Sequence, residues 1–142
     1  RTFVKVYYKD LTIIDGNEGA HITANELLEQ ESIEIKAQEG ARVEAGLEVD
    51  NVNIRGVTGG IIKLTGRANH QFIKINTGGI FEGKELHTNT TEILVQAGGE
   101  AEVHASKKVD VKVRAGGNVN VYGNPEEVNQ SKLIGGTVKI MR

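Results

Sequence analysis

A pair of small residues recurs seven times along this chain of 142 residues, and no other feature constrains the fold as strongly. Successive pairs are separated by 18 to 21 residues. A period near 20 that persists along a whole chain is typical of a solenoid, in which each coil buries its apolar side against the next coil. The pairs are Gly19-Ala20, Gly40-Ala41, Gly59-Gly60, Gly78-Gly79, Gly98-Gly99, Gly116-Gly117 and Gly135-Gly136.

The sequence predicts one strand after each pair and another before most pairs. Apolar and polar residues alternate after a pair, as in Asn118-Val119-Asn120-Val121, and again before it, as in Ile73-Lys74-Ile75. Period-two alternation is typical of strands with one buried face. Helix formers gather only in residues 25–32 (NELLEQES), which we interpret as a turn or an edge insertion because the segment is too short for an amphipathic helix.

Strands that recur without long helices between them are expected to pair in parallel with their counterparts one coil away. The predicted fold class is therefore all-β, a single-domain right-handed parallel β-helix of about seven coils with a period near 19–20 residues. We expect one domain over residues 1–142, with capping strands in residues 1–18 and repeated coils in residues 19–142.

Glycine is expected where such a chain turns a corner, because a residue without Cβ adopts positive φ and allows the neighbouring coil to approach closely. The P-loop and dinucleotide-binding patterns do not occur, so the glycines indicate geometry and not phosphate binding. The expected structural corners are Gly59, Gly60, Gly78, Gly79, Gly98, Gly99, Gly116, Gly117, Gly135 and Gly136.

Charge and composition exclude several classes of function. The 17 basic and 19 acidic residues give a net charge of -2, and neither sign forms a long run, so we expect no nucleic-acid partner and no membrane insertion. Cysteine is absent, which excludes disulfides and thiolate metal sites. Because the chain opens on Arg1, we expect it to be the product of a removed export signal, secreted or held in the cell envelope.

Residues of neighbouring coils meet when they have the same phase, counted from the glycine pair. The four histidines, His21, His70, His87 and His104, all differ in phase, so no two are expected to stack as a metal or acid–base pair. Glu82 and Glu102 share a phase and could meet the separation that a glycosidase needs, but no pocket is predicted near them. We therefore expect no enzyme, no catalytic residue, no cofactor and no metal site.

One polar stack is expected. Asn51, His70 and Asn89 have the same phase in three successive coils, and we interpret them as a turn ladder whose side chains satisfy each other's hydrogen bonds. The alternative is a ligand-binding groove.

The segment GGNVNVYGNP, residues 116–125, is followed by LIGG at residues 133–136. These residues resemble the closing coils of the putative auto-transporter adhesin, head GIN domain family, and the resemblance extends over about residues 41–140. It departs where corners read Thr-Gly-Gly or Ala-Gly-Gly in place of the commoner Ser-Gly-x-Gly. The resemblance implies a bacterial β-helix of the surface or envelope, often from Bacteroidetes, with a role in adhesion.

Two classes of function follow. As an adhesin, the protein would present ordered rows of side chains on a flat solenoid face to surface glycans or extracellular matrix proteins. As a structural or self-assembling envelope protein, it would associate through a coil end or a side face into a homo-oligomer. A polysaccharide-active enzyme is a distant third.

Overall fold

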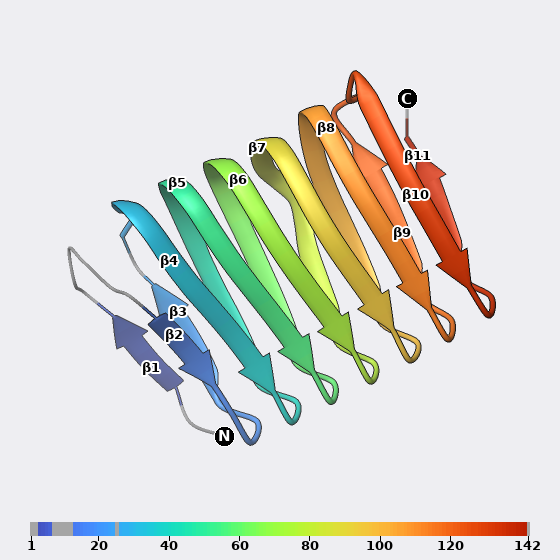
Figure 1. The fold of residues 1–142 in the computed structure, drawn as a ribbon. Coiled ribbons are helices and arrows are strands. Elements are labelled where there is room, and N and C mark those ends of the chain that lie inside the picture. Colours follow the sequence, from blue (N-terminus) through green and yellow to red (C-terminus); the bar gives the residue numbers. More distant parts are fainter. Residues whose placement is uncertain (1–2, 7–12, 25, 142) are drawn as a thin grey trace.

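The computed structural model describes residues 3–6, 13–24 and 26–141. Every regular element in this part of the chain is a strand, and the strands form one parallel solenoid of about seven coils, as predicted (Figure 1). The strands are β1 (Phe3–Val6), β2 (Ile13–Gly16), β3 (His21–Ala24), β4 (Leu28–Gln38), β5 (Arg42–Val57), β6 (Ile61–Asn76), β7 (Ile80–Gln96), β8 (Glu100–Arg114), β9 (Asn118–Tyr122), β10 (Glu127–Leu133) and β11 (Thr137–Ile140).

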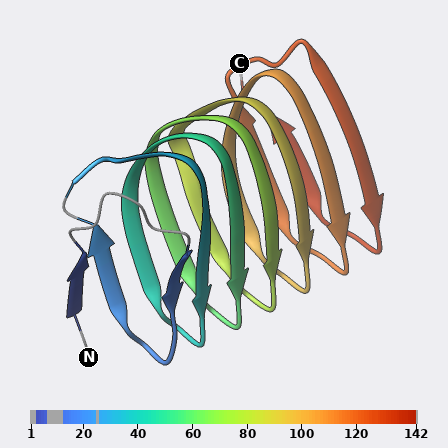
Figure 2. The same ribbon diagram turned by 60° about the vertical axis from the view of Figure 1, so that its left-hand side comes forward.

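Each complete coil is a flattened loop with two arms. In β5, a first arm (residues 42–46) leads into a bend (residues 47–51), and a second arm (residues 52–57) returns to a tight turn. The tight turns form one row at the bottom of Figure 1, and the bends form another at the top. Seen from the N-terminal end in Figure 2, the chain rises along the first arm and descends along the second in a clockwise sense as it recedes, so the solenoid is right-handed.

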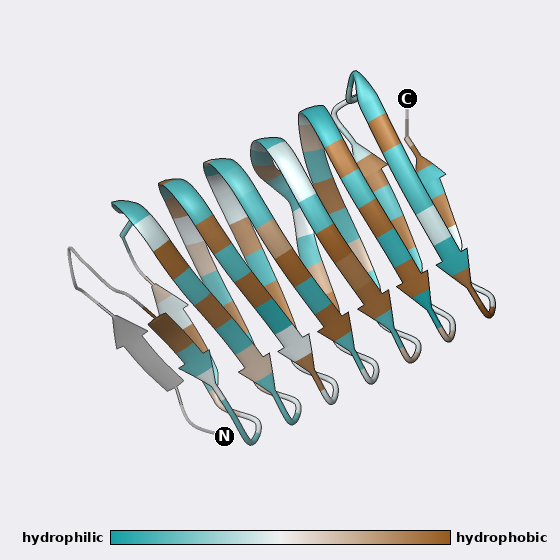
Figure 3. Cartoon of the chain, in the orientation of Figure 1, coloured by the Kyte–Doolittle hydropathy of each residue, from teal (hydrophilic) through white to brown (hydrophobic). Residues whose placement is uncertain are grey.

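The core lies between the two arms. Hydrophobic and hydrophilic residues alternate along the strands (Figure 3). The parallel register aligns the inward residues of successive coils, as for Val43 with Ile62 on the first arm and Ile54 with Ile73 on the second. Val43, Ile62, Phe81, Val95 and Val119 are all 0% exposed. Burial of these apolar columns supplies the main favourable term of folding.

The tight turns use the two-residue geometry otherwise common in β-hairpins. In the turn that follows β5, Thr58 and Gly59 have φ of 49° and 74°, and the N–H of Gly60 donates to the carbonyl of Val57 over 2.9 Å. Positive φ at both central residues is characteristic of a type I′ turn. Here the two arms that flank the turn, the second arm of β5 and the first arm of β6, pair with the matching arms of neighbouring coils and not with each other.

The two glycines of a pair have different environments. Gly59 has positive φ, and its N–H donates to the carbonyl of Thr77 in the next turn over 3.1 Å. Gly60 lies so close to the preceding coil that a Cβ at this position would overlap the carbonyl oxygen of Ala37. In this turn the first position therefore requires a backbone conformation and the second requires the absence of a side chain, whereas the first two pairs of the chain have alanine, Ala20 and Ala41, at the second position.

A chain of buried hydrogen bonds crosses the interior near the bend. Gln71 donates to Thr91 over 2.9 Å, the Thr91 and Thr88 hydroxyls lie 2.8 Å apart, and Thr88 donates to the carbonyl of His104 over 2.6 Å. Because Thr88 uses its only proton on that carbonyl, Thr91 must be the donor to Thr88. These hydrogen bonds link the coils of β6, β7 and β8, and each donor points toward the C-terminal coil or the next hydroxyl in the chain of bonds.

One interpretation of the N-terminal region changes. Residues 28–32, expected in a turn or insertion, form the start of β4, because Leu28 is buried at 1% exposure and pairs in register with Leu47. The segment expected to provide caps contains β1 and β2, which pair in parallel with β3 and β4 as part of the same sheet, while residues 1–2 and 7–12 lie outside the described residues.

No helix in the described part of the chain has the length and apolar character needed to cross a membrane.

Two single substitutions distinguish the roles of the paired glycines. We expect Gly60→Ala to lower the free energy of unfolding by about 3 kcal/mol, because the new methyl group must push two coils apart. Gly78→Ala meets no atom within 4 Å and has only the strain of a φ of 73° to overcome, so we expect a loss of about 1 kcal/mol. Urea unfolding of both variants measures the difference, and equal losses would contradict the separation of roles.

Candidate functional site

The second arms of the coils present a flat outer surface, which we call the second-arm face (outward residues of segments 34–38, 53–57, 72–76, 92–96 and 110–114). The parallel register stacks its side chains into columns. One column contains Glu34, Asn53, Phe72, Glu92, Asp110 and Asn129. The next contains Lys36, Arg55, Lys74, Leu94, Lys112 and Ser131.

A shallow hollow of about 560 Å³ lies on this face and spans several coils from β4 to β8. Phe72 and Leu94 provide apolar surface in its lining, and Phe72 is 42% exposed. Leu94 is two residues beyond Glu92, the register partner of Phe72, which places the two apolar side chains diagonally across neighbouring strands. Polar and charged side chains of both columns complete the lining.

The charges of the hollow are only partly paired. Glu34 forms an ion pair with Lys36 at 3.4 Å, and Asp110 lies 3.7 Å from Lys108, which is outside the hollow. Among the described residues, the other charged side chains of the lining form no ion pair: Arg55, Lys74, Glu92, Lys112 and Arg114. The unpaired groups are thus four cations and one carboxylate.

The first arms present a different surface, the first-arm face (outward residues of segments 42–46, 61–65, 80–84, 100–104 and 118–122). Arg42 contacts Glu44 at 3.3 Å and Glu82 at 3.7 Å, so its charge is neutralised within the fold. Glu82 and Glu102 are register partners, as their common phase predicted, and with Glu100 they line a hollow of about 300 Å³. The sequence did not predict this hollow. Its charged residues are all acidic, whereas the lining of the second-arm hollow contains four cations and three carboxylates.

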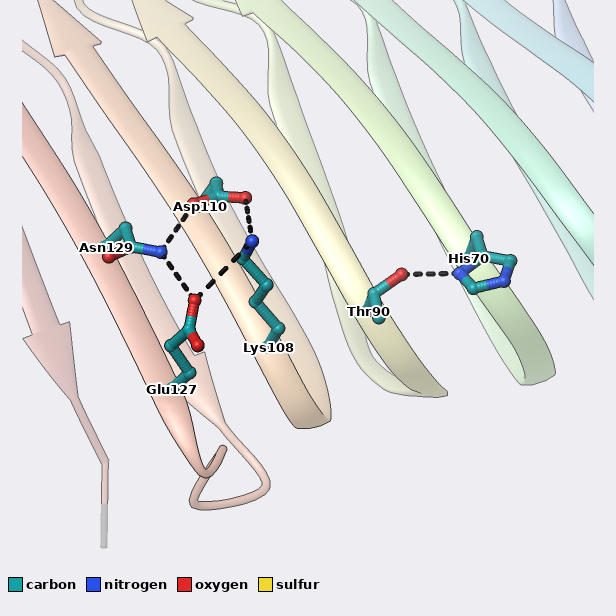
Figure 4. Close-up of polar contacts among 6 residues, drawn as sticks. All are labelled: His70, Thr90, Lys108, Asp110, Glu127 and Asn129. Atoms are coloured by element: carbon teal, nitrogen blue, oxygen red, sulfur yellow. Dashed lines mark hydrogen bonds and ion pairs between the residues drawn. The ribbon is translucent and has the colours of Figure 1, made fainter.

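The predicted turn ladder has a different third member. Asn51 and His70 are register partners, but the residue opposite His70 is Thr90, whose hydroxyl lies 2.6 Å from His70 Nδ1 (Figure 4). Asn89 lies one position earlier and donates instead to Asn69 over 3.1 Å. The expected position of Asn89 was wrong because β6 and β7 differ by a register shift between Lys63 and Gly66, which counting from the glycine pair does not detect.

Asn89 belongs to a second polar row at the bends. Asn69 donates to Asp50 over 2.6 Å, and Ser106 donates to Asn89 over 3.4 Å. A related cluster in the later coils joins Lys108, Asp110, Glu127 and Asn129 (Figure 4). These contacts lie within the fold itself and stabilise successive bends.

The prediction that no two histidines stack is wrong. The rings of His87 and His104 lie parallel, with centroids 4.1 Å apart and planes 5° apart. The register offset between β7 and β8 falls from 20 residues at Glu82 and Glu102 to 17 at the histidines, because β7 contains an irregularity between Glu82 and His87. Tyr122 follows His104 in the same column, and Lys84 Nζ lies 4.9 Å from the centre of its ring.

Burial lowers the pKa of His104 below its ordinary value of 6.5, and the neighbouring His87 lowers it further, while Glu85 acts in the opposite direction. His104 Nδ1 is buried without a hydrogen-bond partner, and a proton on it would be a buried unsatisfied donor. The pair lines a hollow of about 380 Å³ with Arg67 and Glu85. Within the described residues, no group of three His, Asp or Glu side chains is placed to hold a metal ion.

Analysis of the sequence alone did not identify Phe72 or the unpaired cations. The signal for Phe72 was present, because Phe72 precedes the alternation Ile73-Lys74-Ile75 at an outward, normally polar place. The pairing of a cation depends on the side-chain geometry between neighbouring coils. The position of a residue relative to the glycine pair does not contain this information.

Comparisons with known proteins agree with this architecture. The family model described as putative auto-transporter adhesin, head GIN domain, matches residues 1–125. Among solved structures, the chain is similar to the crystal structure of a putative adhesin from Bacteroides fragilis, with a TM-score of 0.85 and 23% sequence identity. The similarity covers 92% of this chain but only 61% of that one. No curated protein matches the chain.

The lowered pKa of His104 predicts how stability depends on pH. The unfolded chain binds a proton at this histidine near pH 6.5, whereas the folded protein binds it only at lower pH. The free energy of unfolding is therefore highest above pH 6.5, and the contribution of His104 is lost as the pH falls below that value. Urea unfolding between pH 5 and 8 measures this effect. We expect His104→Gln to flatten the profile and His70→Gln, outside the pair, to retain it; identical profiles for wild type and His104→Gln would contradict the assignment.

Proposed function

Since the chain belongs to the putative auto-transporter adhesin, head GIN domain family, we propose that it is a non-enzymatic adhesin module of the bacterial surface or envelope that binds glycans. The second-arm face is the proposed binding surface. Family membership and the solenoid fold support an adhesin-like protein of the cell surface. The choice of ligand and of face is drawn from the hollow described above.

One observation supports the choice most strongly: Phe72 lies 42% exposed within a hollow that polar side chains otherwise line. A ligand that covers Phe72 and the neighbouring Leu94 would remove from water apolar surface that folding leaves exposed. Sugar rings combine an apolar C–H face with peripheral hydroxyl groups. Phe72 offers a flat surface for the first, and Asn53 and Glu92 on either side of it offer hydrogen bonds for the second.

A glycan fits this face better than an extended peptide does. Peptides that extend a sheet need a free strand edge, but the second arms of β5, β6 and β7 pair with a coil on both sides. A peptide lying along the solenoid axis would place same-face side chains about 6.6 Å apart, whereas the columns repeat at about 4.8 Å. The two spacings do not match over successive coils.

Self-association is the second candidate, and it has a separate observation in its favour. Leu133, the last residue of β10, and Ile134, in the turn that follows, are 60% and 78% exposed, and Met141 is 38% exposed after β11. Apolar side chains gathered in these late coils would suit contact with another solenoid. Light scattering across a range of protein concentrations tests this candidate.

Truncation of the aromatic ring tests the proposed function. We expect the purified protein, displayed multivalently on a glycan array, to bind a subset of glycans, and Phe72→Ala to weaken binding of each single site by about 3- to 10-fold through loss of ring contact. Leu27→Ala is the matched control, since Leu27 is 52% exposed and lies outside the hollow. Equal binding by Phe72→Ala and wild type would contradict the choice of face, and no binding to any glycan would contradict the function.

A further inference from the structure

The second-arm face contains a row of positive charge in which only Lys36 has an ion-pair partner among the described residues. Lys36, Arg55 and Lys74 follow one another in register in three successive coils, and Lys112 continues the column beyond Leu94. Strands one coil apart are separated by about 4.8 Å, and like charges directly opposite each other are destabilising. Folding alone gives no reason to place Arg55 beside Lys74.

The three carboxylates of this face form no ion pair with Arg55, Lys74 or Lys112: Glu92 has no ion-pair partner among the described residues, and the other two are held elsewhere. Glu34 is used by Lys36 at 3.4 Å, and Asp110 is held by Lys108 at 3.7 Å and by an amide hydrogen bond from Asn129 at 2.9 Å. Arg55 and Lys74 form no ion pair among the described residues. Both line the hollow that contains Phe72.

The positive charge is a property of this face and not of the whole protein. The chain has a net charge of -2, and the hollow of the first-arm face is lined by three glutamates. Sequence composition averages the two faces and therefore conceals the difference between them. An anion approaching the second-arm face meets a local field opposite in sign to the net charge.

From this asymmetry we infer that the glycan bound by the second-arm face is acidic, carrying carboxylate or sulfate groups. The inference rests on the proposed function and specifies its ligand. The Arg55 guanidinium can contact a carboxylate or sulfate through two parallel N–H donors, and the Lys74 ammonium can contact the next acidic group as a point charge. Phe72, which lies two residues before Lys74 on β6 and diagonally across from Arg55 on β5, contacts the sugar ring that bears these groups. Binding removes the repulsion between Arg55 and Lys74 by placing an anion against them.

The test uses three polymers with one backbone: dextran, carboxymethyl-dextran and dextran sulfate. Each is immobilised, and binding of the full protein is measured at 50 and 300 mM NaCl. We expect at least one acidic polymer to bind 10-fold or more tightly than dextran at low salt and to lose most of that advantage at high salt, where exposed charges are screened. A preference between the two acidic polymers identifies the carboxylate or the sulfate as the group recognised.

Matched charge variants separate recognition from general attraction. Arg55→Gln with Lys74→Gln should weaken binding of the acidic polymer by 10-fold or more, whereas Lys63→Gln with Lys139→Gln removes the same charge from exposed positions of the first-arm column and should change it less than 2-fold. Thermal unfolding confirms that both variants are folded. The first variant removes a like-charge contact and is expected to be at least as stable as wild type.

Three results would overturn the inference. Equal, salt-insensitive binding of dextran and its acidic forms that Phe72→Ala weakens would retain the proposed function and reject the acidic ligand. Equal losses in the two charge variants would show attraction without a site. A change in oligomeric state with Arg55→Gln and Lys74→Gln, without a change in polymer binding, would indicate that this face contacts the acidic face of a second copy. Absence of binding to these polymers and to the whole glycan array would instead reject the proposed function itself.

Discussion

The close parallel approach of successive coils is the constraint on which the rest of this structure depends. Strands pair on both sides only if neighbouring coils remain about 4.8 Å apart, and the tight turns are where the backbones come closest. Gly60 lies against the carbonyl of Ala37, and the N–H of Gly59 donates to the next turn. A side chain at Gly60 or Gly79 would overlap a backbone carbonyl of the preceding coil and force the two coils apart, although the first two pairs accommodate alanine at this position. The small-residue period is therefore the physical condition for the solenoid.

Fixed coil spacing converts the sequence of each arm into columns of side chains. The inward columns form the core, and the outward columns form two faces with different electrostatic character. Arg42 is neutralised by Glu44 and Glu82 on the first-arm face, whereas Arg55 and Lys74 face solvent on the other. Because adjacent positions in a column are separated by a full coil in sequence, a local sequence window does not reveal which charges meet.

The fold could be predicted from the sequence because the period and the alternation are both physical requirements of stacked strands. The glycine pairs located the turns, and segments such as Ile73-Lys74-Ile75 located the buried columns. The two failures of register have one cause. Phase counting assumes coils of equal path, but β7 shifts register against both neighbours, which displaced Asn89 by one position and brought His87 against His104. The segment starting at Leu28 was expected in a turn or an insertion for a different reason: its composition favours neither strand nor buried core, yet Leu28 is buried and pairs in register with Leu47.

The register shifts also explain why an irregular repeat can present a regular face. Between β6 and β7 the offset is 19 residues at Lys63 and Glu82 but 20 along the whole second arm, from Phe72 and Glu92 to Asn76 and Gln96. Between β7 and β8 the offset changes only at and before the bend, and it is a constant 18 from Thr90 and Lys108 onward. Differences in coil length are therefore absorbed before the second arm begins. The columns of the second-arm face remain aligned across coils of different length, which a surface that binds an extended, repeating ligand requires.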